Sequence, residues 1–69
     1  MNQEAFNLSI RKFLKQFGVA AQREIERAVE QALSDGRLQG TESLRATATV
    51  RLERVGLDHA ETGEITLDE

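Results

Sequence analysis

The sequence predicts an α+β fold in which a two-helix hairpin packs on a C-terminal antiparallel β-hairpin, in the order ααββ. Apolar residues recur with a helical period in the first half of the chain, and Gly18 interrupts that half. From Leu44 the apolar period changes to 2, which is typical of a half-buried strand. We expect a single domain over residues 1–69, with helices at about 2–17 and 20–35 and strands at about 44–54 and 58–68.

The first expected helix has a start, an apolar face and a stop. Asn2 is a good N-cap, and Met1 and Phe6 have the spacing of a hydrophobic staple. Gly18 supplies the stop, because glycine enters the left-handed conformation without strain. The apolar face comprises Phe6, Ile10, Phe13, Leu14 and Phe17.

The second expected helix begins near Ala20 and ends near Asp35, with Gly36 as its stop. Its start is unusual, because Ala20 and Ala21 stand where Ser, Thr or Asp would cap, and a missing cap costs roughly 1 kcal/mol. The expected buried face consists of Ala21, Ile25, Ala28, Val29, Ala32 and Leu33.

The C-terminal part reads as two strands joined near Val55–Leu57, where a turn or bulge is expected. The first strand points alternate apolar residues to one face, and Ile65 and Leu67 supply the same pattern in the second. The apolar residues of the first strand are Leu44, Ala46, Ala48, Val50 and Leu52.

Two registers of this hairpin are compatible with the sequence. One pairs Val50 with Ile65, which also places Arg51 opposite Glu64. The other turns tightly at Val55–Gly56 and places Leu52 opposite His59.

The composition of the chain excludes several classes of protein. The chain has 69 residues and no Cys, so it is small, has no disulfide and offers no thiolate ligand to a metal. No apolar run approaches the ~20 residues of a membrane span, and no signal-peptide pattern opens the chain. We therefore expect a cytoplasmic protein that does not engage a membrane.

Charge is unevenly distributed along the chain. Residues 1–54 carry nine Lys/Arg and seven Asp/Glu, whereas residues 55–69 carry five acids and no Lys or Arg. We interpret the acidic end as a solvated arm that keeps a small protein soluble. The alternative is an acidic strip that meets a basic patch on a partner or on a second copy.

The sequence contains no set of residues that indicates catalysis. It has no Gly-rich phosphate loop, no paired nucleophile and base, and no spaced His cluster. His59 and Glu61 could share one strand face as two metal ligands, but two ligands without a third make a weak site. We expect no enzyme activity, no cofactor and no metal.

A helix, a Gly turn, a second helix and a β-hairpin are also compatible with nucleic-acid binding. Against this reading, residues 20–35 carry two Arg against four acids, and the chain has no Tyr or Trp to stack on bases. Nucleic-acid binding is therefore the alternative rather than the leading hypothesis. The residues that could contact phosphates are Arg11, Lys12, Lys15, Arg23 and Arg27, with Arg51 on the hairpin.

The leading hypothesis is a non-enzymatic interaction or structural module that acts as a symmetric homodimer. A two-stranded ribbon leaves both edges unpaired, and the first strand has no Pro to block pairing with another strand. The edge residues proposed for the dimer are Thr47, Thr49 and Arg51. An unidentified protein partner at the same edge is the other possibility.

Five stretches of the chain together form a recognisable pattern: residues 6–15, Gly18-Val19, residues 22–26 with Ala28-Val29, residues 55–59 and residues 63–65. In these stretches the chain resembles a family of short bacterial proteins catalogued only as a domain of unknown function. The resemblance covers nearly the whole chain, and it implies a small cytoplasmic protein with no catalytic or binding residues to transfer. Ala20 and Ala21 depart from the Thr or Ser that this pattern has at the start of its second helix, which puts the capping there in question.

Overall fold

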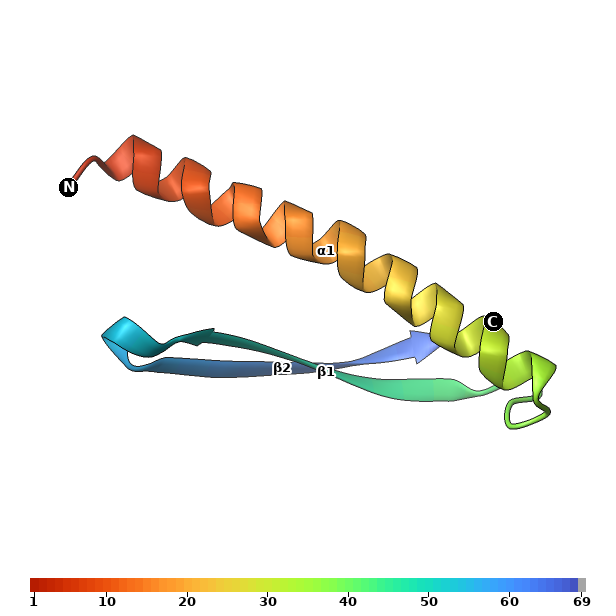
Figure 1. Ribbon diagram of the computed structural model, residues 1–69. Helices are drawn as coiled ribbons and strands as arrows, with labels where there is room; N and C mark the ends of the chain where they lie inside the picture. Colours follow the sequence, from red (N-terminus) through yellow and green to blue (C-terminus); the bar gives the residue numbers. More distant parts are fainter. Residues whose placement is uncertain (69) are drawn as a thin grey trace. The chain divides into compact units, whose positions relative to one another are not determined.

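The N-terminal half of the protein is one uninterrupted helix. In the computed structural model, which describes residues 1–68, α1 spans Gln3–Ser34 and contains 32 residues (Figure 1). The predicted α+β class is confirmed, but the two-helix hairpin is wrong. Gly18 lies inside α1 and is not among the glycines with positive φ, so it does not end a helix.

The reason for the continuous helix lies in the residues on both sides of Gly18. A break would leave unpaired N–H and C=O groups at two new helix ends, and Ala20 and Ala21 offer no side chain to cap them. A glycine inside a helix costs only about 1 kcal/mol relative to alanine. The apolar face also continues in phase from Phe17 to Ala21, four residues on, so one helix keeps it on one side.

Both ends of α1 form as predicted, with one exception. The side chain of Asn2 accepts a hydrogen bond from the N–H of Ala5 at 3.1 Å, which confirms the N-cap. The predicted staple is wrong, because Met1 is 98% exposed and packs on nothing. At the other end Gly36 has φ +80°, and the N–H of Arg37 donates to the carbonyl of Ala32 at 2.9 Å, as in a Schellman motif.

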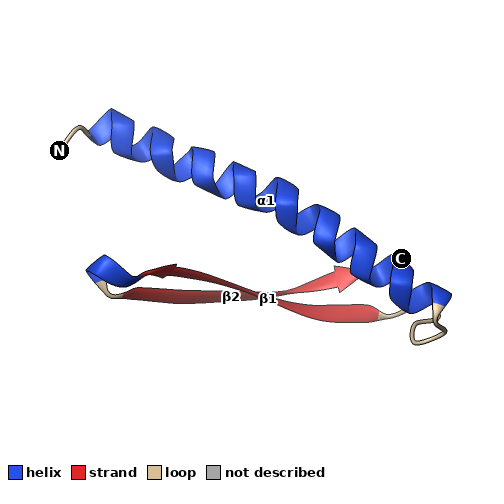
Figure 2. Cartoon of the chain, in the orientation of Figure 1, coloured by secondary structure: helices blue, strands red, loops and turns tan. Residues whose placement is uncertain are grey.

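The chain divides into two units, residues 1–37 with α1 and a second unit that begins at Leu38 and holds the hairpin. In the hairpin β1 spans Ser43–Leu52, the short 3₁₀ helix η1 spans Glu53–Val55 and β2 spans Leu57–Thr66 (Figure 2). Gly56 closes the turn with φ +71°, a conformation that favours glycine.

The two strands pair antiparallel in a register that differs from both alternatives. Leu52 lies opposite Leu57, and Val50 lies opposite His59. Pairing of Val50 with Ile65 is therefore wrong by six residues, and pairing of Leu52 with His59 is wrong by two. The turn is longer than a tight turn at Val55–Gly56 because η1 occupies it.

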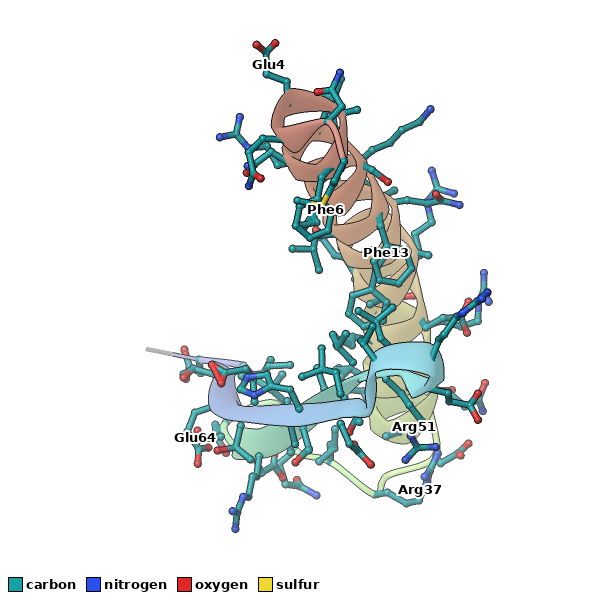
Figure 3. The ribbon with its side chains drawn as sticks, turned by 90° about the vertical axis from the view of Figure 1, so that its left-hand side faces the viewer. Glu4, Phe6, Phe13, Arg37, Arg51 and Glu64 are labelled. Atoms are coloured by element: carbon teal, nitrogen blue, oxygen red, sulfur yellow. The ribbon has the colours of Figure 1, made fainter. Side chains whose placement is uncertain are left out.

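The hairpin has one apolar and one polar face, as the alternation predicts. Arg51 and Glu64 project on the same side of the ribbon (Figure 3), which is the polar face. On that face the guanidinium of Arg51 lies 3.3 Å from the Asp58 carboxylate across the strands. The apolar face carries Leu44, Ala46, Ala48, Val50 and Leu52 from β1, and Leu57, Gly63 and Ile65 from β2.

Few side chains are withdrawn from solvent. Ala32, at 9% exposure, is the one buried residue among residues 1–68. Val50 and Ile65 in the hairpin, and Ala21 and Val29 in α1, are half-buried. Neither a lone helix nor a two-stranded ribbon has an interior of its own, so most of the apolar surface of both remains to be covered.

Candidate interaction surfaces

The largest apolar surface of α1 runs along one side of the helix. Six of its large side chains are between 39% and 55% exposed, with Ile25 at the low end and Phe13 at the high end. Figure 3 shows Phe6 and Phe13 projecting from the helix. We call this surface the apolar stripe; it comprises Phe6, Ile10, Phe13, Leu14, Phe17, Ala21, Ile25, Ala28 and Ala32.

The apolar stripe follows an eleven-residue spacing. Phe6, Phe17 and Ala28 are separated by eleven residues each, and Ile10, Ala21 and Ala32 repeat the same interval. Eleven residues make about three turns at 3.67 residues per turn, close to the 3.6 of a straight α-helix. The stripe therefore stays on one side of α1 along its length instead of winding around it.

A second surface of α1 is basic. Lys12, Lys15 and Arg23 line an open hollow along one side of the helix, together with Val19. Arg11 lies beside Lys12 in sequence, and we call Arg11, Lys12, Lys15 and Arg23 the basic strip. None of these four forms an ion pair within the described part of the chain.

Arg27, unlike the four residues of the basic strip, forms an ion pair in the structure. Its guanidinium lies 2.8 Å from the Glu24 carboxylate, one turn back along α1. Both side chains are about 70% exposed, so the pair contributes well under ~1 kcal/mol to stability. Arg27 is nevertheless partly neutralised by Glu24, unlike the basic strip.

The three residues proposed for a dimer edge share the polar face of β1. Thr47 lies opposite Thr62, Thr49 lies opposite Ala60, and Arg51 lies opposite Asp58. The sheet has two strands, so among residues 1–68 each strand is hydrogen-bonded to a neighbour on one side. The outer edge of β1 carries the unpaired backbone groups that strand addition requires.

The two candidate metal ligands contact each other. The Nε2 atom of His59 lies 3.1 Å from a carboxylate oxygen of Glu61, on the face of the hairpin that is otherwise apolar. Within residues 1–68 no group of three or more His, Asp or Glu side chains is arranged to hold a metal ion.

Sequence reasoning missed a carboxylate that organises the connection before β1. The side chain of Glu42 accepts hydrogen bonds from the N–H groups of Gln39 at 2.9 Å, Gly40 at 3.0 Å and Thr41 at 3.2 Å. These donors, the Gln39 N–H foremost, lower the pKa of Glu42 because they stabilise its ionised form. Gly40 lies two residues before Glu42 and has φ +100°. A glycine at this spacing before an acid is the sequence signal that could have indicated the turn.

Comparison with known protein families shows to which family the chain belongs. The sequence pattern of a family of unknown function, DUF6494, matches residues 1–68. The chain belongs to DUF6494. The DUF6494 match covers the residues of α1, of both strands and of the Glu42 turn.

No curated protein and no solved structure matches the DUF6494 chain. Within the described residues of this DUF6494 protein, no helix has the length and apolar character needed to cross a membrane.

Proposed function

We propose that this DUF6494 protein is a non-enzymatic interaction module that acts as a homodimer, and that its two copies meet through the apolar stripe of α1. The observation that carries this proposal is the exposed apolar side of a 32-residue helix, in a chain where Ala32 is the single buried residue among residues 1–68. A chain of this size gains too little from its own core to offset the entropy of folding, and self-association supplies the missing burial.

The lengths of the helix and the strands favour a second copy of the chain as the partner that covers the apolar stripe. Thirty-two helical residues span about 48 Å, whereas the ten residues of each strand span about 33 Å. The apolar stripe itself, from Phe6 to Ala32, spans about 39 Å, so about 6 Å of it exceeds the length of a strand. A second α1 helix, about 48 Å long, has the length to lie along the whole stripe.

The exposed area is also sufficient for a specific interface. Phe13 and Phe17 are 55% and 44% exposed. An aromatic side chain presents roughly 150–250 Å², so the two rings expose roughly 200 Å² per chain and roughly 400 Å² per pair of chains. The aliphatic residues of the stripe bring this toward the ~1,000 Å² that a specific interface requires.

The dimer is tested by mass measurement in solution. Light scattering across a concentration series, with the concentration taken from refractive index because the chain has no Trp or Tyr, is expected to give twice the 7.7 kDa chain mass. A monomer at every concentration would refute the proposal.

A matched pair of variants tests the surface. Phe13→Glu places a carboxylate in the apolar stripe, whereas Gln16→Glu makes the same charge change among residues of the basic hollow. Burying an unpaired carboxylate costs several kcal/mol, so Phe13→Glu is expected to weaken dimerisation by about 100-fold or more. Gln16→Glu is expected to leave it within about threefold. Equal effects of the two substitutions would exclude the stripe as the interface.

A second function, nucleic-acid binding by the basic strip, is favoured by one observation. Residues 5–23 contain four Lys/Arg and no Asp or Glu. A labelled DNA duplex titrated at low salt tests it, with Lys12→Glu as the variant and Gln22→Glu, also at an exposed position, as the control. Phosphate contacts predict an affinity that falls steeply with salt, and no binding at low salt would exclude this function.

A further inference from the structure

The apolar stripe of α1 is symmetric about residue 19. Eight of its nine positions have a counterpart on the stripe whose number sums with their own to 38, as in Phe17 with Ala21, Phe13 with Ile25, and Ile10 with Ala28. The exception is Leu14, whose counterpart is Glu24 and lies outside the stripe. A two-fold rotation beside residue 19 therefore places the stripe of one copy on the stripe of another.

We propose that the two α1 helices of the homodimer pair antiparallel, with the two-fold axis at the level of residue 19, on the stripe side of the helix between Phe17 and Ala21. This inference rests on the homodimer proposed for the protein and adds the orientation and the register of its helices. In this arrangement the apolar stripe of each copy contacts the same stripe of the other copy, which runs in the opposite direction.

Side-chain size favours this orientation. The N-terminal half of the stripe carries large residues, whereas the C-terminal half carries three alanines and Ile25. Antiparallel pairing sets Phe17 against Ala21 and Ile10 against Ala28 of the second copy, while Phe13 meets Ile25. In two of these three pairs a large residue faces an alanine, so the bulk is spread along the interface, which favours an even separation of about 8–10 Å between the helix axes.

Parallel pairing would set identical residues against each other. Phe13 and Phe17 would face their own copies at one end, while Ala28 would face Ala28 at the other. The phenylalanines would hold the axes apart where the alanines need them close, and the alanine half would be left poorly packed.

Charge favours the same orientation. Antiparallel pairing places residues 5–23, which carry four Lys/Arg and no acid, beside residues 15–33 of the second copy. That segment carries three Lys/Arg and three Glu, so it is neutral overall. Parallel pairing would instead place two segments of charge +4 side by side, and the two helix dipoles would repel each other as well.

The burial of Ala32 sets the extent of the overlap. Ala32 would meet Phe6 of the second copy, but it is 9% exposed and has little surface left to offer. The paired region therefore runs from Ile10 to Ala28, 18 residues apart, or about 27 Å along the helix.

The orientation is tested by a distance between spin labels on the full chain. The protein has no cysteine, so Gln3→Cys gives one label per chain, and position 3 lies outside the paired region. Antiparallel pairing predicts about 48 Å between the two labels along the axis, and parallel pairing predicts about 10 Å. A dimer with the short distance would overturn the antiparallel arrangement and leave the homodimer standing.

Disulfide formation gives an independent test. A mixture of Ile10→Cys and Ala28→Cys chains is expected to form cross-linked heterodimers, while each variant alone is not, because like residues lie about 27 Å apart. Cross-linking of Ile10→Cys with itself would overturn the proposal. Light scattering of the Gln3→Cys protein separates these results from failure of the homodimer, since a monomer at all concentrations would overturn both.

Discussion

Replacing Gly18 by alanine is expected to stabilise the protein, because the residue lies inside a helix and not in a turn. Gly18 has no positive φ, and a Cβ atom added there meets nothing within 4 Å. The substitution therefore removes the entropic cost of glycine without adding a clash.

The size of the effect follows from helix propensity. Alanine is favoured over glycine in a helix interior by about 1 kcal/mol, or about 2 kcal/mol for a dimer with two copies of α1. For a chain of this length, 1 kcal/mol corresponds to about 4–8 °C in melting temperature. Thermal unfolding followed by far-ultraviolet circular dichroism, at a fixed protein concentration, measures this shift.

The same substitution at Gly36 is the matched control. A Cβ atom at Gly36 also meets nothing within 4 Å, but the residue has φ +80°, where a side chain is strained. Gly36→Ala is therefore expected to lower the melting temperature while Gly18→Ala raises it. A fall for Gly18→Ala similar to that of Gly36→Ala would show that Gly18 forms a turn and would refute the single helix.

Three further predictions concern the ends of α1 and the hairpin unit. Asn2→Ala removes the N-cap and is expected to lower the free energy of unfolding by about 1 kcal/mol, as measured by urea denaturation. The lowered pKa of Glu42 means that its contribution to stability is present above the usual pKa of 4.5 and is lost as pH falls below it. Glu42→Gln is thus expected to lower the melting temperature at pH 7 but not in acid, whereas the control Glu53→Gln is expected to leave it unchanged at both. A pH series of thermal melts checks this. An equal loss of melting temperature for Glu42→Gln at all pH values would contradict it. Arg51 and Asp58 are more than 60% exposed, so a double-mutant cycle is expected to give a coupling free energy below about 1 kcal/mol, and a larger value would contradict this estimate.

The ends of α1 could be predicted from the sequence, but its continuity could not be judged from Gly18 alone. Asn2 and Gly36 each satisfy groups at a helix end, and both do so in the structure. Gly18 gives the same local signal as Gly36. The difference lies in the residues that follow, because Ala20 and Ala21 cannot cap a new helix and the apolar face continues through Ala21 without a shift in phase.

The faces of the hairpin could be predicted, whereas its register could not. Moving the pairing by two residues, from Leu52 opposite His59 to Leu52 opposite Leu57, keeps every side chain on the same face. Alternation of apolar residues therefore cannot distinguish these registers. The turn decides the register, through η1 and the positive φ of Gly56.

The candidate surfaces were predicted in part. The basic residues were found from charge alone, but charge along the sequence does not show that Arg27 pairs with Glu24 while Arg23 has no such partner in the described chain. The apolar stripe was predicted as two buried faces. Its exposure depends on the helix being single, which is decided by Ala20 and Ala21 after Gly18 and by the unbroken phase of the apolar face.

The arginines of β1 also bear on how the chain avoids forming fibrils. Between Arg45 and Arg51 lie five uncharged residues, Ala-Thr-Ala-Thr-Val, which have the composition of an aggregation-prone segment without Pro or Gly. In a stacked assembly each arginine would lie about 4.8 Å from its copies in the next layers, and the repulsion would recur in every layer. We expect the two arginines to act as gatekeepers in the unfolded chain, before the hairpin that later pairs Arg51 with Asp58 has formed.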